Sequence, residues 1–159
     1  MMTQRPSWQE YFMQMALLAA TRSTCLRRAV GAALVRDNQI ISTGYNGSPK
    51  NSPHCNEVGC LREAKNIPSG EKHELCRGVH AEQNAIIQAA INGSSTRDAE
   101  LYCTHQPCSI CAKMIINAEI RRIYIANSYP DDLALQLLTE ASIEMILLDP
   151  DNGVCQRIC

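Results

Sequence analysis

The chain has few aromatic side chains and no surplus of positive charge. Phe, Trp and Tyr make up 4% of its 159 residues, and its formal net charge at pH 7 is −1. Proteins that bind single-stranded nucleic acid usually stack bases on several aromatic rings along a basic groove. Both absences therefore argue against a nucleic-acid partner and favour a small-molecule substrate.

Long apolar segments are also missing from the sequence. No run of eighteen apolar residues is present that could span a bilayer. A short apolar segment near the N-terminus follows Arg5 and Glu10 and is interrupted by Gln14, which is unlike a signal peptide. We therefore expect a cytoplasmic protein that has no membrane partner.

Cysteine is the residue type in excess, with nine copies in the chain. In a reducing compartment, cysteines more often bind metal or lie buried as thiols than form disulfides. The positions of the cysteines therefore bear first on metal binding.

Two short motifs carry the chemistry of the sequence, His80-Ala81-Glu82 and Pro107-Cys108-Ser109-Ile110-Cys111. One histidine and two cysteines supply three ligands for a zinc ion and leave the fourth tetrahedral position open for water. Glu82 is then close enough to accept a proton from that water and pass it to a leaving group. The pattern H-x-E…P-C-x-x-C is the signature of zinc-dependent nucleobase deaminases. The alternative, a structural zinc knuckle, would need a fourth protein ligand.

Hydrophobic periodicity predicts four long helices and five strands. We expect helices over 8–21, 80–91, 107–119 and 131–142, and strands over 30–35, 39–43, 100–104, 121–126 and 143–148. Ser7 and Glu10 form a capping box at the start of the first helix. A hairpin followed by βα crossovers predicts a mixed sheet covered by helices. The polar segment 50–78 is longer than most loops and must be functional, tied down or disordered.

With these motifs placed on helix starts, the chain resembles the deoxycytidylate (dCMP) deaminases of the cytidine deaminase superfamily over nearly its whole length. The distinguishing pieces are Val30-Gly31-Ala32, Gly44-Tyr45-Asn46-Gly47-Ser48-Pro49, His80-Ala81-Glu82-Gln83-Asn84-Ala85 and Cys103-Thr104-His105-Gln106-Pro107-Cys108. The resemblance implies one domain over residues 1–159 with a three-layer α/β/α fold, in which helices flank a five-stranded mixed sheet.

The resemblance implies hydrolytic deamination of dCMP to dUMP and ammonia, which supplies dUMP for thymidylate synthesis. His80, Cys108 and Cys111 would bind the catalytic zinc, and Glu82 would move the protons. Family likeness assigns Asn46 to hydrogen bonds with the sugar and Tyr129 to packing against the nucleotide, and it adds Ala81 to the substrate-binding residues. From the residues alone, Asn46 is equally a turn residue, and Tyr129 is a surface aromatic before a proline.

A second, structural zinc is the further metal site that the resemblance implies. Four ligands would close such a site and tie down the insertion 50–78, because the free energy of metal binding becomes free energy of folding. Cys60 competes for one ligand position, and ordinary free thiols with a surface histidine are the alternative. The four matching positions are Cys25, Cys55, His73 and Cys76.

Family likeness also implies a homo-oligomer, with a hexamer favoured. Ile91 stands where a regulated relative has arginine, so the regulation by dCTP and dTTP seen in larger members is not implied. If a nucleotide effector binds, Mg²⁺ would accompany it. Bidentate arginine suits phosphate best, and the candidates to meet the 5′-phosphate are Arg22, Arg27, Arg28, Lys50 and Arg77.

Other functions remain open at this point. The first alternative is another deaminase of the superfamily, acting on dCTP, cytidine or a pyrimidine of the riboflavin pathway. The second is a catalytically silent zinc module of the kind found in competence operons. The presence of Glu82 argues against the silent module, because a structural site needs no general base.

Overall fold

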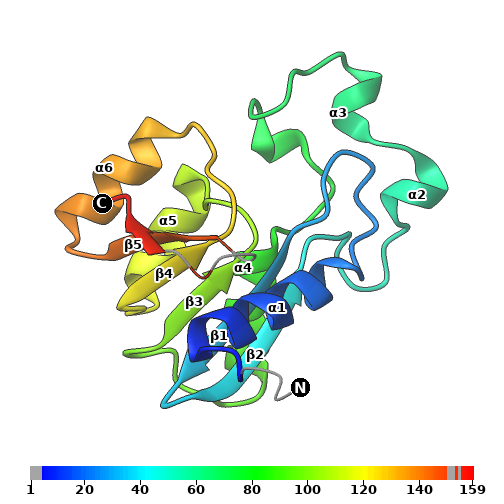
Figure 1. Cartoon of the computed structure of the whole chain (residues 1–159). Helices are drawn as coiled ribbons and strands as arrows, with labels where there is room; N and C mark the ends of the chain where they lie inside the picture. Colours follow the sequence, from blue (N-terminus) through cyan, green and yellow to red (C-terminus); the bar gives the residue numbers. More distant parts are fainter. Residues whose placement is uncertain (1–4, 150–152, 154) are drawn as a thin grey trace.

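A six-stranded mixed β-sheet forms the centre of the molecule (Figure 1). The structure is a computed structural model that describes residues 5–149, 153 and 155–159. The strands lie in the order β2-β1-β3-β4-β5-β6. Their bounds are β1 Gly31–Arg36, β2 Gln39–Tyr45, β3 Glu100–Cys103, β4 Arg122–Ile125, β5 Glu144–Leu148 and β6 Cys155–Arg157.

The direction of the strands changes three times across this sheet. The hairpin strands β1 and β2 are antiparallel, and β1 is also antiparallel to β3. The central strands β3, β4 and β5 are parallel, which fits the helical crossovers predicted between them. At the other edge, β6 is antiparallel to β5.

The predicted count of five strands was wrong, because β6 adds a sixth. In this strand Arg157 pairs with Ile146, and Cys155 pairs with Leu148. All three residues of β6 are exposed, so the segment has no buried face and gives no alternating hydrophobic pattern. Pairing with β5, not local sequence, makes this segment a strand.

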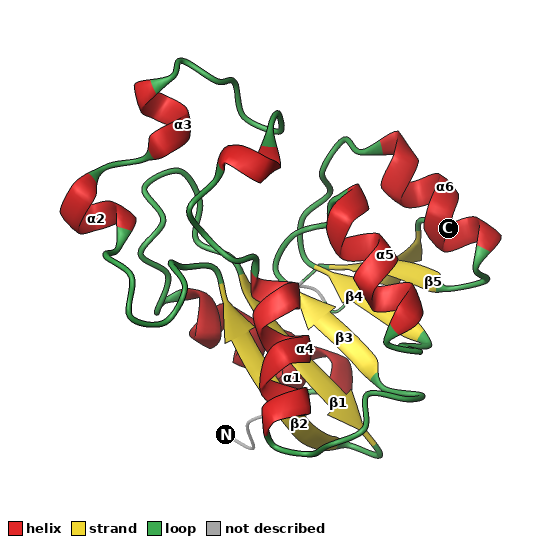
Figure 2. Cartoon of the chain, turned by 180° about the vertical axis from the view of Figure 1, so that it is seen from behind, coloured by secondary structure: helices red, strands yellow, loops and turns green. Residues whose placement is uncertain are grey.

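Helices cover both faces of the sheet. Helix α1 (Trp8–Ala20) lies on one face, where Phe12, Met13 and Ala16 are buried with Ala33, Val35 and other side chains of the sheet (Figure 1). The opposite face carries α4 (Ala81–Ile91), α5 (Ser109–Asn117) and α6 (Asp132–Glu140) (Figure 2). The predicted three-layer α/β/α architecture is thus confirmed.

Side chains of β1 alternate between these two layers. Ala32 and Leu34 belong to the core under α4, α5 and α6, whereas Ala33 and Val35 belong to the core under α1. Because both faces are covered, the strand is a continuous buried run instead of an alternating one.

Two glycines let helices approach the hairpin closely. A Cβ atom at Gly31 would collide with the backbone carbonyl of Ala16 in α1, and one at Gly44 would collide with the carbonyl of Ala81 in α4. The contact at Gly44 sets the first turn of α4 directly on β2, and this turn follows the metal-ligand candidate His80.

The insertion 50–78 contains short helical turns that the sequence did not predict: α2 (Cys55–Val58), α3 (Leu61–Ala64) and the 3₁₀ turn η1 (His73–Leu75). A capping box starts α2, with the backbone N–H of His54 donating to the Glu57 carboxylate at 2.8 Å. Figures 1 and 2 both show α2 and α3 standing clear of the sheet. None of the described helices is long and apolar enough to cross a membrane.

Candidate metal centre and substrate cavity

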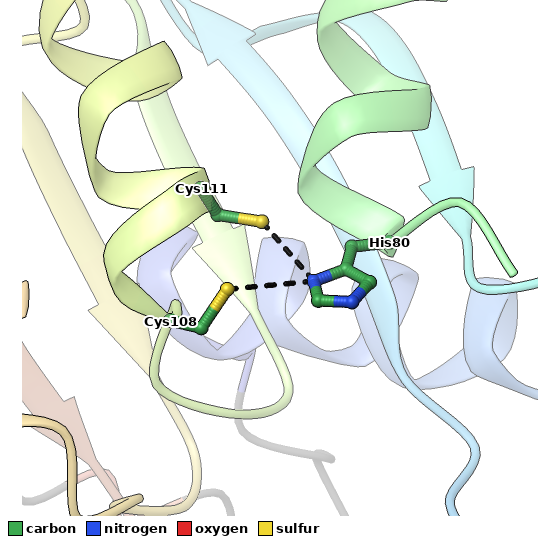
Figure 3. A group of neighbouring side chains, drawn as sticks. All are labelled: His80, Cys108 and Cys111. Carbon is green, nitrogen blue, oxygen red and sulfur yellow. Dashed lines mark hydrogen bonds between the residues drawn. The ribbon is translucent and has the colours of Figure 1, made fainter. Parts of the chain in front are cut away.

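Two helix starts bring three metal-binding side chains together. His80 is the N-cap of α4 and Cys108 is the N-cap of α5, while Cys111 lies in the first turn of α5 (Figure 3). The Nδ1 atom of His80 lies 3.5 Å from Sγ of Cys108 and 3.3 Å from Sγ of Cys111. In the described part of the chain, this is the one group of three such donors that all lie within 4.8 Å of one another.

Hydrogen bonds fix the two helix starts that carry these ligands. The backbone N–H of His80 donates to the Gln83 side chain at 2.8 Å, which closes the first turn of α4. Asp131, the N-cap of α6, accepts from the backbone N–H groups of Ala134 and Ser109. Because Ser109 follows Cys108 directly, this carboxylate ties the first turn of α5 to α6 and holds the cysteine pair in place.

The donor set fits a zinc ion. Two sulfur atoms and one imidazole nitrogen are ligands that zinc prefers, and three protein ligands leave one tetrahedral position for water or substrate. A hydrogen bond with the Cys111 thiol lowers the pKa of Cys108, although burial opposes the shift, and this favours the thiolate form that binds zinc. The N-terminus of α5 favours negative charge at the same place.

Glu82 lies in the first turn of α4 and lines the cavity beside these ligands. Its side chain is 4% exposed. Burial raises the pKa of Glu82 to about 7, and the nearby His80 offsets part of the shift. A carboxyl group with a pKa near neutrality can both accept and return a proton, which is what acid–base catalysis requires.

The cavity above the metal ligands has a positive lining. Among the described residues that line it, Glu82 supplies the one carboxylate, and arginines supply positive charge. Such a lining suits an anionic ligand. The arginines that line it are Arg27, Arg28, Arg62 and Arg77. Of the predicted phosphate contacts, Arg22 and Lys50 do not line it.

Asn46, Ala81 and Tyr129, the residues predicted to bind substrate, line this cavity. Asn46 also has a structural role, because its Oδ1 accepts from the Val30 backbone N–H and its Nδ2 donates to the Arg28 carbonyl, both at 2.8 Å. The residue therefore fixes the chain that enters β1. The role of these three residues in substrate binding stays a prediction.

The four residues predicted for a second zinc do not gather as one group. Burial, together with the nearby Cys25, Cys60 and Cys76, raises the pKa of Cys55, so these four cysteines are neighbours. The ring centroid of His73 lies 5.3 Å from that of His80, with the two rings at 76°. Cys25, Cys55, Cys60, His73 and Cys76 all line the same cavity, but among the described residues no three of these donors all lie within 4.8 Å of one another. The second zinc itself stays a prediction.

Sequence reasoning missed Gln106 as a cavity residue. The side chain is 6% exposed and lines the cavity, and its Oε1 accepts from the Tyr129 backbone N–H at 3.2 Å. Its Nε2 is buried without a hydrogen-bond partner among the described residues. The signal available in the sequence was the position of Gln106 two residues before Cys108, within the distinguishing piece Cys103-Thr104-His105-Gln106-Pro107-Cys108.

Comparisons with known proteins agree with this geometry. Residues 6–127 match the family model described as the cytidine and deoxycytidylate deaminase zinc-binding region. The chain is 40% identical over 152 residues to deoxycytidylate deaminase of Schizosaccharomyces pombe, covering 94% of this chain and 47% of that protein. It is 42% identical over 149 residues to ComE operon protein 2 of Bacillus subtilis, covering 92% and 75%. The chain therefore spans about half the length of the fission yeast relative.

A solved structure shares the fold. The dCMP deaminase of cyanophage S-TIM5, crystallised in complex with dCMP and dUMP, superposes with a TM-score of 0.74 at 30% sequence identity. The match covers 90% of this chain and 98% of the phage protein. The likeness therefore includes nearly all of the phage enzyme.

Proposed function

Because the chain belongs to the cytidine and deoxycytidylate deaminase zinc-binding family, we propose that it hydrolyses dCMP to dUMP and ammonia. The observation that carries this proposal is a buried carboxyl group, Glu82, beside a three-ligand metal centre in an arginine-lined cavity. Relatives named deoxycytidylate deaminase and the phage enzyme crystallised with dCMP support the choice of substrate.

His80, Cys108 and Cys111 would hold the zinc ion, which when bound acidifies a water molecule and so supplies the nucleophile at neutral pH. Glu82 accepts the proton that this water loses as its oxygen bonds to C4 of the cytosine ring, and it delivers that proton to N3. Glu82 next takes the proton of the attacking hydroxyl and gives it to the amino nitrogen. The C4–N bond then breaks, and ammonia and a C4 carbonyl result.

The remaining expectations belong to the same proposal. We propose one domain over residues 1–159, a cytoplasmic homo-oligomer, with a hexamer favoured, and the supply of dUMP for thymidylate synthesis. A second zinc held by Cys25, Cys55, His73 and Cys76, with Cys60 as the competitor for one ligand position, would tie down the insertion 50–78. These points rest on the family likeness and on the cysteine positions.

A second candidate is a zinc module without catalytic activity, because the chain is also similar to ComE operon protein 2, whose name states no deaminase activity. Glu82 favours the deaminase, because burying a carboxyl group costs stability. A structural module would gain nothing from this residue.

Ammonia release by the zinc-loaded protein tests the proposal, with dCMP, deoxycytidine, CMP and dCTP supplied in parallel. Preference for dCMP is the expected result. Turnover of only the nucleoside or only the triphosphate would retain the zinc chemistry and overturn the substrate. No release from any of the four compounds would favour the silent module.

A further inference from the structure

We propose that Asn127 is a positioning residue of the metal centre, which orders the loop 104–108 so that the Cys108 side chain is in place before the metal binds. The inference rests on the zinc centre of the proposed function. It extends that centre beyond its three ligands and Glu82 to a residue that is neither a ligand nor, among the described residues, part of the cavity lining.

The loop and Asn127 leave the sheet side by side. Strands β3 and β4 are parallel neighbours, so the segments that follow them start at the same edge of the sheet. The loop 104–108 follows β3 and ends at Cys108, the N-cap of α5, while Asn127 lies two residues beyond the end of β4. The backbone N–H of Ala126 donates to the carbonyl of Cys103 at 3.2 Å, which continues the pairing of the two strands up to this point.

Asn127 holds the loop at two points. Its side-chain Nδ2 donates to the carbonyl of Thr104 at 2.8 Å, and its backbone carbonyl accepts from the N–H of Gln106 at 2.9 Å. The side-chain amide thus does for Thr104 what a backbone N–H does in a β-ladder, at a place where the ladder has ended. The two hydrogen bonds fix the course of the loop immediately before Pro107 and Cys108.

Thr104 anchors the start of the loop to the hairpin. Its backbone N–H donates to the carbonyl of Gly31 at 3.0 Å, and its Oγ1 accepts from the N–H of Gly31 at 3.1 Å. Thr104 is 1% exposed, so these bonds are shielded from water. The loop therefore starts from a fixed point between β1 and Asn127, and Asn127 sets its direction from there.

The residue after Cys108 is held from the same segment that contains Asn127. The carboxylate of Asp131 accepts from the N–H of Ser109 at 2.8 Å. Asn127 and Asp131 therefore brace the chain on both sides of Cys108 from one short segment, 127–131. A ligand loop that is ordered before binding loses less entropy when the metal binds, so we expect this brace to raise the affinity for zinc.

The zinc affinity of Asn127→Ala tests this role. Asn127 is exposed, so the substitution leaves the core intact. Chelator competition on zinc-loaded protein should give a zinc dissociation constant about fivefold above that of wild type, which is the effect of about one net hydrogen bond. The ion that Cys111→Ser loses marks the competition step of this centre. Asp131→Ala, which removes the other half of the brace, should shift the same step.

The matched control is Asn117→Ala, because Asn117 is an exposed asparagine at the other end of α5. At equal, measured zinc content, Asn127→Ala should lower kcat for dCMP and leave KM near the wild-type value, since the brace acts on a metal ligand. A rise in KM without a fall in kcat would place Asn127 in substrate binding and overturn the inference.

An unchanged zinc dissociation constant in Asn127→Ala also overturns the positioning role, even if the thermal midpoint falls, because only general stability would then depend on Asn127. An equal change in Asn117→Ala has the same meaning. A wild-type protein that binds zinc and deaminates none of the four compounds would instead overturn the proposed function. The positioning role would stand in that case, because it is measured on zinc binding.

Discussion

Glu82 shows how an ordinary residue acquires its chemistry from its surroundings. The carboxyl group is buried at the start of α4, and burial raises its pKa to about 7. Two cysteines and a histidine on neighbouring helix starts provide the metal ligands within reach of the same cavity. The motif spacing was sufficient to predict these four residues, because each lies in the first turn or at the cap of a helix that the sequence marks clearly.

Removal of one ligand tests the metal centre at this scale. Cys111→Ser should lower the zinc content by one ion per chain, because the two remaining ligands cannot retain zinc in dilute solution. Mass-spectrometric metal analysis after dialysis measures the change. Cys155→Ser, at an exposed thiol outside the site, is the matched control. Equal zinc contents for Cys111→Ser and wild type would contradict the assigned ligands.

At the scale of the elements, close contacts between helices and the hairpin position the site. Gly44 lets the first turn of α4 rest on β2, and the Ser7–Glu10 capping box starts α1 on the opposite face. Helices α1 and α4 were both predicted from local sequence, since helix caps and hydrophobic periodicity are local signals. The turns α2 and α3 were not, because four residues are too few to show helical periodicity, and the exposed strand β6 was not, because it depends on pairing with β5.

Gly44→Ala should lower the free energy of unfolding by about 1–3 kcal/mol, as overpacking a tight contact does. The added methyl group would overlap the Ala81 carbonyl and push α4 away from β2. Urea denaturation at saturating zinc measures the loss. Gly47→Ala is the control, because a Cβ there meets its nearest neighbour at 3.5 Å. Equal stabilities for Gly44→Ala and Gly47→Ala would contradict this packing.

The capping box predicts a pH dependence. Hydrogen bonds from the Ser7 side chain and backbone lower the pKa of Glu10 below its usual 4.5. A depressed carboxyl pKa stabilises the fold above the unfolded-state pKa, and this contribution disappears as the pH falls through the folded-state value. Glu10→Ala should therefore lower the thermal midpoint at about pH 7 and show a smaller difference from wild type at about pH 3. A difference that stays constant between the two pH values would contradict the assignment.

At the scale of the whole molecule, the insertion 50–78 supplies part of the lining of the cavity. Its cysteines, Cys55, Cys60 and Cys76, come near Cys25 from the segment before β1, whereas His73 faces His80. The resemblance of the sequence to the deaminases implied that Cys25, Cys55, His73 and Cys76 tie this insertion through a second zinc. It could not decide between Cys60 and His73, since that choice depends on how the insertion folds. Gln106 was missed for a similar reason, because its contact with Tyr129 joins distant segments.

Metal analysis of ligand variants distinguishes these two residues. We expect two zinc ions per wild-type chain, with Cys60→Ser losing one of them and His73→Asn losing none. Limited proteolysis within 50–78 should become faster in Cys60→Ser alone. Loss of zinc from His73→Asn with retention in Cys60→Ser would restore the ligand set predicted from sequence. A single zinc ion in the wild-type chain would contradict the second site.

The most direct test of the proposed mechanism compares dCMP turnover by wild type and Glu82→Gln at equal, measured zinc content. The variant keeps the three metal ligands and removes the group that moves the protons, so its turnover should fall by roughly 10²–10⁴-fold. Glu140→Gln, on α6 and outside the cavity, should match wild type. A Glu82→Gln protein that binds zinc normally and deaminates dCMP at the wild-type rate would contradict the central claim.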